Sequence, residues 1–426
     1  MERLLHSVTL DVDSCVGCTH CIQHCPTQAI RVRDGKATIL EERCIDCGEC
    51  IRVCPHHAKK ARHDTLDALQ KYEYTIALPA PALFGQFQRL EDIDVILSGL
   101  LNLGFNQVFE VSRAAEIVSD ATRQLMADGK LKKPVISSAC PAVVRLIQIR
   151  FPNLCDHVLP LKAPMEVAAA LARQRAMTAT GLAPEKIGVF FISPCPAKVT
   201  DVRFPIGFSH SQVDGVLAIS DIYPRLVSEM NHLETVKPLL SSGVIGVSWS
   251  FIGGEAAGTL DEHHLSADGI QNVIHVLEDL EDEKFADLDF IELNACAGGC
   301  VGGVFTTENG YVARARIKHL RKYLPVSCNR ADEIGTIESL CWSQPLEENP
   351  ALRLAENVSD AMRLMQAAEE IFGHLPKLDC GSCGAPTCRA MAEDVALGLA
   401  SEDDCIFRMR ERLHHAEEEL KGEGTP

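Results

Sequence analysis

The chain has 426 residues, of which 46% are hydrophobic and 23% are charged, so it is long enough for two or three globular domains. Acidic residues outnumber basic ones by 59 to 41, and the net charge of -18 argues against nucleic acid and anionic membranes as partners. Because we find no apolar run of about 18 residues and no secretory pattern at the start, we expect a cytoplasmic protein. The 19 cysteines then favour metal or redox chemistry over a disulfide framework.

Two cysteine motifs of the same spacing, C-x2-C-x2-C-x3-C-P, lie near the start of the chain. In such a motif three thiolates hold one cubane and the fourth reaches the neighbouring cluster. We therefore predict two 4Fe-4S clusters. One is held by Cys15, Cys18, Cys21 and Cys54, and the other by Cys44, Cys47, Cys50 and Cys25. The segment up to about residue 62 resembles a bacterial two-cluster ferredoxin, which implies a small α+β unit that passes single electrons.

The middle of the chain alternates strand-like and helical segments, which is typical of an α/β domain. We expect strands within residues 74–83, 186–193, 243–250 and 289–296, and helices within 94–105 and 163–177. Four cysteines lie in loops after strand-like runs: Cys140, Cys195, Cys296 and Cys300. Loops at strand ends are where α/β folds place their sites, although a single free cysteine is usually a small buried hydrophobe.

Together these four cysteines and their neighbours resemble the three signature loops of FeFe-hydrogenases, written TSCCPxW, MPCxxKxxE and ExMACxxGCxxGGG. The matching positions are Ser137, Ser138, Ala139, Cys140 and Pro141, then Ser193, Pro194, Cys195, Lys198 and Asp201, then Glu292, Leu293, Asn294, Ala295, Cys296, Cys300, Gly302 and Gly303. The resemblance implies that the four cysteines hold the cubane of an H-cluster, with Cys300 bridging to a two-iron subsite that carries CO and CN ligands. It also implies that Lys198 donates hydrogen bonds to a cyanide of that subsite.

Several positions depart from the family pattern. The cysteine that relays protons in catalytic members is Ala139 here, whose methyl group cannot carry a proton. The two methionines that flank the iron pair are Ser193 and Asn294. A relay serine becomes Leu159, two relay glutamates map to Asp120 and Arg123, the loop tryptophan becomes Val143 and the last glycine of the third loop becomes Val304. Loss of a positioned acid or base should slow turnover by a factor of roughly 10² to 10⁴ without preventing cofactor binding.

A third motif, C-x2-C-x4-C-x16-C, lies near the end of the chain and uses Cys380, Cys383, Cys388 and Cys405. Four thiolates separated by small residues fit a third 4Fe-4S cluster, with tetrahedral zinc as the alternative. The spacing is similar to that of a small iron-sulfur domain of anaerobic electron-transfer proteins. We expect a helix within 351–375 and a charged amphipathic helix with a loose tail over 408–426.

The predicted architecture is multidomain, α/β and α+β. A ferredoxin-like module with two clusters occupies 1–76, a two-lobed α/β H-cluster domain 77–345, and a helical iron-sulfur domain 346–426. Three cysteines have no partner at ligand spacing, Cys155, Cys328 and Cys341, and we expect buried structural thiols there.

The resemblance and the departures together suggest a low-turnover hydrogenase-type protein of the sensory lineages usually called groups C and D. It would report redox state or dihydrogen through three further 4Fe-4S clusters, with a redox or signalling protein as partner and hydrogenase maturases to load it. One alternative is a competent hydrogenase with another proton path, through water or Asp120. Another is an electron-transfer protein that carries only cubanes.

Overall fold

The computed structural model describes residues 6–422, which separate into two compact units. Unit 1 comprises 6–7, 45–48 and 61–349, and unit 2 comprises 8–44, 49–60 and 350–422. The front and rear cysteine motifs therefore share unit 2, apart from Cys47. The domain boundaries at 76 and 345 stay a prediction. Within 6–422, no helix is both long enough and apolar enough to cross a membrane.

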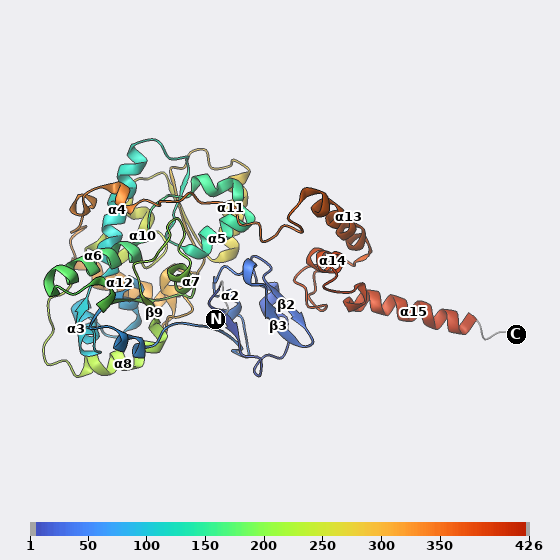
Figure 1. Ribbon diagram of the computed structural model, residues 1–426, viewed down its shortest axis with the longest axis horizontal. Coiled ribbons are helices and arrows are strands. Elements are labelled where there is room, and N and C mark those ends of the chain that lie inside the picture. The colour runs from blue at the N-terminus through green and yellow to red at the C-terminus, as the bar shows by residue number, and fades with distance from the viewer. Residues whose placement is uncertain (1–5, 423–426) are drawn as a thin grey trace. The chain divides into compact units, whose positions relative to one another are not determined.

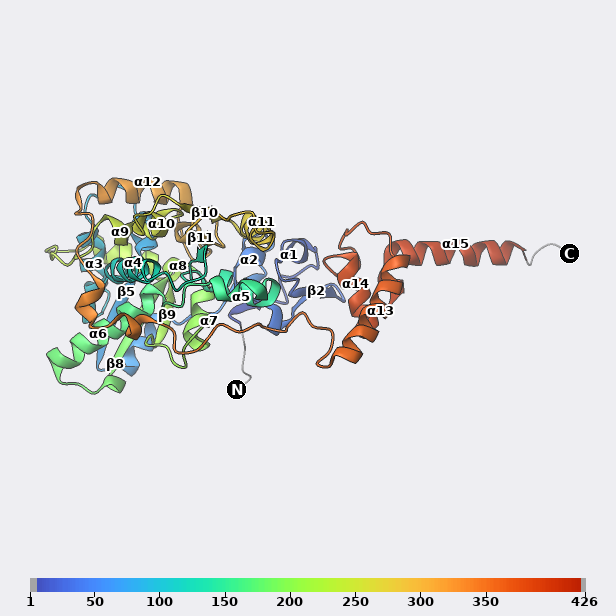
Figure 2. The ribbon, with the colours of Figure 1, turned by 90° about the horizontal axis from the view of Figure 1, so that it is seen from above.

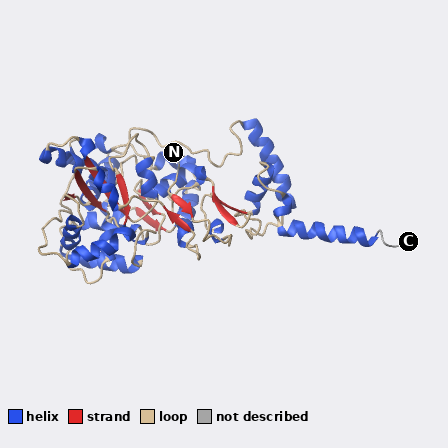
Figure 3. Cartoon of the chain, turned by 60° about the horizontal axis from the view of Figure 1, so that its bottom comes forward, coloured by secondary structure: helices blue, strands red, loops and turns tan. Residues whose placement is uncertain are grey.

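Ten α-helices described in unit 1 surround its sheets (Figure 1). They are α3 (Ile93–Asn102), α4 (Val111–Ala127), α5 (Pro141–Arg150), α6 (Pro164–Thr180), α7 (Ala197–Arg203), α8 (Ile219–Asn231), α9 (Val244–Ser248), α10 (Gly254–Gly258), α11 (Ile270–Glu281) and α12 (Gly310–Leu320). Figure 3 shows the strands of this unit enclosed by helices. The α/β class predicted from the sequence is confirmed.

A four-stranded parallel sheet in the order β6-β5-β8-β9 forms one lobe of unit 1. Its strands are β5 (Tyr74–Pro79), β6 (Gln107–Val108), β8 (Ile187–Ser193) and β9 (Gly215–Ala218). Successive side chains of a strand point to opposite faces of the sheet. Ile76 and Leu78 of β5 accordingly pack with α4 and α6, whereas Ala77 packs with α3 and α8 on the other face. Both faces are apolar, as expected of a parallel sheet covered by helices.

A three-stranded parallel sheet in the order β10-β11-β7 forms the second lobe. Its strands are β7 (Val135–Ile136), β10 (His264–Asp268) and β11 (Phe290–Asn294). Ile136 and Ile291 pack with α5 and α11 on one face. Val135 and Phe290 point the other way and join the core formed by α4, α6 and the larger sheet. The two lobes therefore share one hydrophobic core.

Unit 2 begins with two small pairs of strands. The pairs are β1 (Val8–Leu10) with β4 (Lys59–Ala61), and β2 (Ile30–Arg33) with β3 (Lys36–Ile39), and two short helices, α1 (His20–Gln23) and α2 (Glu49–Arg52), accompany them. The β2–β3 hairpin turns through Asp34 and Gly35, both with positive φ, as a tight two-residue turn requires. This arrangement is the α+β unit expected for the front motifs.

The rest of unit 2 is helical, with α13 (Val358–His374), α14 (Cys388–Ala396) and α15 (Ile406–Gly422). Helices α13 and α14 lie side by side in Figures 1 and 2, and α15 extends beyond them. The expected helix within 351–375 begins only at Val358, because the side chain of Asn357 caps it by accepting from the Asp360 N–H. The loose tail expected after α15 (Ile406–Gly422) lies outside the described residues.

One predicted strand is wrong. Residues 243–250 include helix α9 rather than a strand. Short apolar runs are ambiguous from periodicity alone. Here tertiary packing decides, because a Cβ added at Gly246 would lie 2.0 Å from the Ser112 carbonyl oxygen, so this segment must approach α4 closely. The expected strands within 74–83, 186–193 and 289–296 are present as β5, β8 and β11.

Candidate functional site

The four cysteines of the middle domain lie at the carboxyl ends of strands from both lobes. Cys140 follows β7 and forms the N-cap of α5, with Pro141 at the first helical position, where a missing N–H costs nothing. Cys195 follows β8, and Cys296 follows β11. Because β8 belongs to the larger sheet and β7 and β11 to the smaller one, the set is contributed by both lobes.

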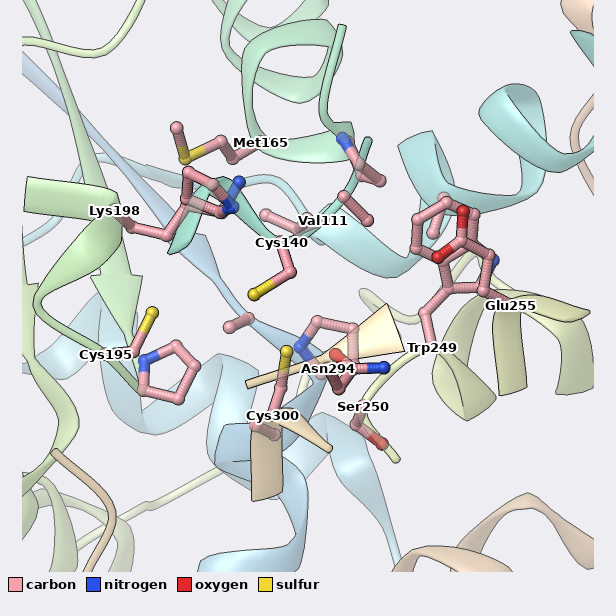
Figure 4. A pocket seen from close by; sticks show the side chains of 18 of the residues that line it. Val111, Cys140, Met165, Cys195, Lys198, Trp249, Ser250, Glu255, Asn294 and Cys300 are labelled. Carbon is pink, nitrogen blue, oxygen red and sulfur yellow. The ribbon is translucent and has the colours of Figure 1, made fainter. Parts of the chain in front are cut away.

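Three of these thiols line one cavity of about 90 Å³, several times the space that a single water requires. In Figure 4 the sulfur atoms of Cys140, Cys195 and Cys300 point into the same space. The other residues that line it are Ala80, Pro81, Ala82, Val111, Ala115, Ala139, Pro141, Pro164, Met165, Phe191, Pro194, Lys198, Trp249, Ser250, Glu255, Glu292 and Asn294. Apart from a few polar groups the walls are apolar, which suits a bulky bound group.

The electrostatics of the four thiols fit a metal cluster. Burial, with a smaller contribution from Cys140, raises the pKa of Cys195 to about 11. Burial likewise raises the pKa of Cys300, and its nearness to Cys195, Cys140 and Cys296 raises it further. Four thiolates this close repel one another unless cations lie between them. Iron supplies such charge, so the donor set fits the cubane of an H-cluster.

Lys198 is the cation that faces this cavity. Its side chain is 12% exposed, and Nζ lies 3.5 Å from Oδ2 of Asp201, one turn further along α7. An ammonium has three donors, so Lys198 can keep this ion pair and still donate into the cavity. The hydrogen-bonding role that the resemblance implies for Lys198 stays a prediction.

The three substituted positions have different surroundings. Ala139 lines the cavity, so the side chain at this position borders the space for a bound group. Asn294 also lines the cavity, and its amide donates to Oε1 of Glu292 across 3.0 Å. Ser193 does not line it, because the Ser193 hydroxyl donates to the Cys195 carbonyl across 2.9 Å and accepts from the Cys195 N–H. Ser193 therefore shapes the loop of a ligand cysteine rather than the space for the bound group.

Two buried carboxyl groups, those of Glu255 and Glu292, also line the cavity, and no sequence motif predicts that they lie near each other. Oγ of Ser137 donates to Oε2 of Glu255 across 2.6 Å, and Glu292 accepts from the N–H groups of Gly253 and Ala256. Burial, with repulsion from Glu292, raises the pKa of Glu255 to about 8. Burial also raises the pKa of Glu292. Glu292 belongs to the third loop, but Glu255 lies in no motif.

The other positions considered for proton transfer lie away from this cavity. Asp120 forms an ion pair with Arg123 at 2.8 Å and accepts from the Ala331 N–H. Burial alone would raise the pKa of Asp120, but these hydrogen bonds lower it overall. Leu159 is buried in the shared core. Asp120 is not among the lining residues, so it does not reach the cavity directly.

In unit 2, one of the predicted front sets is brought together. Cys15, Cys18, Cys21 and Cys54 line one small cavity. Burial raises the pKa of Cys21, the other three thiols raise it further, and Lys59 opposes them. The Lys59 side chain lines the same cavity, is buried, and has no hydrogen-bond partner for Nζ among the described residues. An unpaired buried ammonium beside four thiols fits an anionic iron-sulfur cluster.

The second front set is placed less completely. Cys25, Cys44 and Cys50 pack in one cluster of side chains, and Cys25 accepts from the Ala29 N–H. Cys47 lies in the 45–48 segment that belongs to unit 1. Its role as a ligand of the second cluster stays a prediction.

The rear motif is brought together as predicted. Cys380, Cys383, Cys388 and Cys405 line one small cavity between α13, α14 and the start of α15. The N–H of Cys388 donates to Asp379, and hydrogen bonds from Ser382 lower the pKa of Cys380. Four thiols without a histidine in this cavity fit a cubane.

Of the three unassigned cysteines, only one is buried. Burial raises the pKa of Cys155 to about 11. Cys341 is half-buried, and Cys328 is exposed, so the expectation of a buried thiol is wrong for Cys328. The Cys328 N–H donates to the buried carboxylate of Glu116, which anchors the backbone of this loop while the thiol is exposed.

Comparison with protein families assigns each part of the chain. The family described as iron only hydrogenase large subunit, C-terminal domain, matches residues 73–241 and 254–304. A 4Fe-4S dicluster domain matches 7–55, and a family described as an Fe-S cluster matches 375–407. These matches support iron-sulfur clusters at both ends of the chain and an H-cluster domain between them.

Curated relatives match only parts of the chain. The chain is 32% identical over 213 residues to the periplasmic Fe hydrogenase large subunit of Nitratidesulfovibrio vulgaris, covering 46% of this chain and 51% of that protein. It is 29% identical over 146 residues to the NADP-reducing hydrogenase subunit HndD of Solidesulfovibrio fructosivorans, covering 32% and 25%. The chain thus spans about half the length of the first relative and a quarter of the second.

One solved structure agrees on the fold. An FeFe-hydrogenase structure concerned with oxygen inactivation of the H cluster 2Fe subcluster has a TM-score of 0.50 at 16% identity, covering 67% of this chain and 95% of that chain.

Proposed function

Because the chain belongs to the family of iron-only hydrogenase large subunits, we propose that it interconverts dihydrogen with protons and electrons at an H-cluster, slowly, and works as a redox or dihydrogen sensor. The single observation that carries the proposal is the cavity in which Cys140, Cys195, Cys300 and Lys198 meet the methyl group of Ala139. The groups that would hold the cofactor are present, and the group that would relay its protons is missing.

The chain's own residues divide the work of holding the cofactor. Cys140, Cys195, Cys296 and Cys300 would ligate the cubane, and Lys198 would donate to a cyanide of the two-iron subsite. When bound, the H-cluster supplies the centre at which dihydrogen is cleaved or formed. The apolar walls exclude water, which strengthens the hydrogen bonds that Lys198 can make inside the cavity.

Low turnover follows from the proton path. A positioned acid or base typically contributes a factor of 10² to 10⁴, and an alanine methyl group offers none. The carboxylic acids that line the cavity are Glu255 and Glu292. Ser137 donates to Glu255, so a proton would reach this pair through Ser137 rather than through position 139. We propose that this pair transfers the protons that the remaining, slow turnover requires.

The same pair favours a second candidate function, a competent hydrogenase with its own proton route. The pKa of Glu255, about 8, suits a group that gains and loses protons near neutral pH. The N–H of Ala139 donates to Oγ of Ser137 across 3.1 Å, so the Ser137–Glu255 chain begins beside the altered position. This route would replace the one through Asp120, which is held in an ion pair.

The sensory role rests on the electron carriers. We propose two 4Fe-4S clusters at the front and one at the rear, which would pass the redox state of the H-cluster to a redox or signalling protein in the cytoplasm. Hydrogenase maturases would be needed to build the two-iron subsite. Dihydrogen and protons are the small-molecule partners, and the charge of -18 disfavours nucleic acid.

The first test is infrared spectroscopy of the chain after anaerobic maturation with the diiron cofactor, combined with rates of hydrogen evolution and oxidation. Carbonyl and cyanide bands with a low rate are the expected result. Bands with ordinary hydrogenase rates would favour the second candidate. The absence of bands after maturation, with all cubanes present, would instead identify an electron-transfer protein.

A further inference from the structure

The rear cysteine loop packs directly on the front module within unit 2. The Val32 N–H donates to the Gly384 carbonyl across 2.8 Å, so the loop extends the β2–β3 hairpin by one backbone contact. Gly384 has φ of +81°, and a Cβ there would lie 1.8 Å from the Val32 carbonyl oxygen. On the other side of the loop, the Gln23 amide donates to the Cys380 carbonyl. Only glycine permits this close approach.

A buried ion-pair network holds the two parts together. Arg31 of β2 binds Asp394 of α14 through two hydrogen bonds of 2.6 and 3.0 Å, and Arg33 adds a third at 2.9 Å. Arg31 and Asp394 are each 5% exposed. Arg33 also donates to the Cys383 carbonyl. Removal of one member of such a network leaves buried charge unpaired, so the contact is strongly specified.

One residue of β2 touches both cluster sites. Val32 lines the cavity of Cys15, Cys18, Cys21 and Cys54, and its backbone is bonded to Gly384, the neighbour of Cys383. The route between the two sites therefore consists of covalent bonds and one hydrogen bond. Electrons tunnel more readily along such a route than across open space.

The charges at the two sites are unequal. Lys59 is buried in the front cavity without a hydrogen-bond partner among the described residues, whereas Arg33 at the rear loop is paired with Asp394. An unpaired positive charge stabilises the reduced, more negative form of a nearby cluster. The front cluster should therefore have the higher reduction potential of the two.

The exposure of the ligand cysteines also differs between the front and rear sites. Among the cysteines assigned to clusters, all within residues 6–422, Cys380 is the only exposed one. The rear site is thus the one whose ligand reaches the surface, where a partner could exchange electrons.

We propose that the rear cluster is an electron entry port that passes single electrons through Gly384 and Val32 to the front cluster of Cys15, Cys18, Cys21 and Cys54. In each step the rear cluster is oxidised by one electron and the front cluster is reduced by one, with no bond made or broken. A low-potential one-electron donor supplies the rear cluster. The inference rests on the cubanes of the proposed function but not on its dihydrogen chemistry.

The test uses the full chain reconstituted with iron and sulfide but without the diiron subsite, so failure of the hydrogenase proposal cannot affect it. After reduction with dithionite, electron paramagnetic resonance of the wild type should show broadening from interaction between the rear and front clusters. Cys388→Ser, which removes the rear cluster, should abolish this contribution and leave only the interactions among the remaining clusters. A wild-type spectrum equal to the Cys388→Ser spectrum plus an isolated rear signal would overturn the proposal.

Two further variants keep the test decisive if Cys388→Ser folds poorly. Asp394→Asn should weaken the broadening, because it breaks the network to Arg31 and Arg33. Its matched control is Glu369→Gln, which breaks the exposed ion pair to Arg389 between α13 and α14 and should leave the broadening unchanged. Equal spectra for these two variants would argue against a docked rear cluster.

The direction of flow is tested by a redox titration. Lys59→Gln should lower the reduction potential of the front cluster and leave that of the rear cluster unchanged. A wild type whose front cluster has the lower potential would show that electrons do not enter at the rear.

Discussion

Oγ of Ser137 and Oε2 of Glu255 are 2.6 Å apart and both groups are buried, although the two residues are 118 positions apart in the sequence. The hydroxyl lies in the loop that carries Ala139 and Cys140, and the carboxyl group lies in α10. The contact places a titratable carboxyl group on the wall of this cavity, at a position other than Ala139.

Restoring the relay thiol should restore speed. Ala139→Cys is expected to raise the hydrogen-evolution rate of the matured chain by about 10² or more, because it returns a titratable group to the cavity wall. The rate should be compared at equal cofactor loading, judged by infrared bands. Ala82→Cys places a thiol on another wall of the same cavity and should change little. A wild type that is already fast and unaffected by Ala139→Cys would contradict the slow-turnover proposal.

Glu255→Gln should change the pH profile of the residual activity. In the folded chain the pKa of Glu255 is raised to about 8 by burial and by Glu292, so the acid holds its proton below that pH and loses it above. Hydrogen evolution that draws on this proton should fall as pH rises through about 8, and Glu255→Gln should remove this inflection and most of the activity. The profile is measured by film electrochemistry. An unchanged profile in Glu255→Gln would exclude the pair from the proton route.

The raised pKa of Glu255 should also affect stability. Because the folded-state pKa lies above the ordinary value near 4.3, the folded state binds more protons than the unfolded state between these pH values. Stability is therefore highest below the unfolded pKa and decreases as pH rises through about 8. Glu255→Gln should flatten this decrease in thermal unfolding of the cluster-loaded chain. If the wild type instead gained stability over this pH range and the variant did not, the predicted sign of the pH dependence would be wrong.

Removal of one ligand should cost the chain one cluster. Cys300→Ser is expected to lower the iron content by the amount held in the middle domain and to abolish carbonyl and cyanide bands. Cys155→Ser replaces a buried thiol outside every proposed site and should keep full iron content. Iron assay and infrared spectra measure both. Full iron content in Cys300→Ser would remove Cys300 from the ligand set.

Loss of the ammonium group should loosen the two-iron subsite. Lys198→Met keeps much of the side-chain length but removes the donors, and loss of such a supporting contact typically costs 10- to 100-fold in metal affinity. The cyanide bands should shift and less cofactor should be retained after gel filtration. Lys162→Met is the control, because Lys162 donates to the Ser339 carbonyl and does not line the cavity. Identical retention by the two variants would count against the role of Lys198.

The parts of the site that the sequence predicted are those whose chemistry is local. Cysteine spacing predicted the thiols of the front and rear sites, because a cluster fixes the distances between its ligands along the chain. The thiols of the middle site were predicted from the resemblance of their loops to those of FeFe-hydrogenases. Lys198 lies one turn from Asp201 in the same loop-helix segment, so it too could be found from its motif. The strand ends that carry Cys195 and Cys296 were also visible as apolar runs.

Long-range packing decided what the sequence could not show. Glu255 acquires its altered pKa from Glu292 and from burial, neither of which leaves a pattern near residue 255. Residues 243–250 read as a strand but fold as α9 because Gly246 allows close packing on α4. Ser193 was expected beside the iron pair, but its hydroxyl instead donates a hydrogen bond to the backbone carbonyl of Cys195. Strand β10 was not foreseen, since its residues are all half-buried and form no apolar run.

The four thiols of the middle domain come from the ends of strands in two different sheets, so a cluster bound there acts as a staple between the lobes. Metal binding of this kind adds to the free energy of folding. An oxidant that destroys the cluster would therefore remove a connection between the two lobes as well as the activity. A chain that has lost its cluster would be less stable and would unfold more often. Cellular proteases degrade unfolded chains, so they would remove a chain with a damaged cluster but not one that is inactive and still folded.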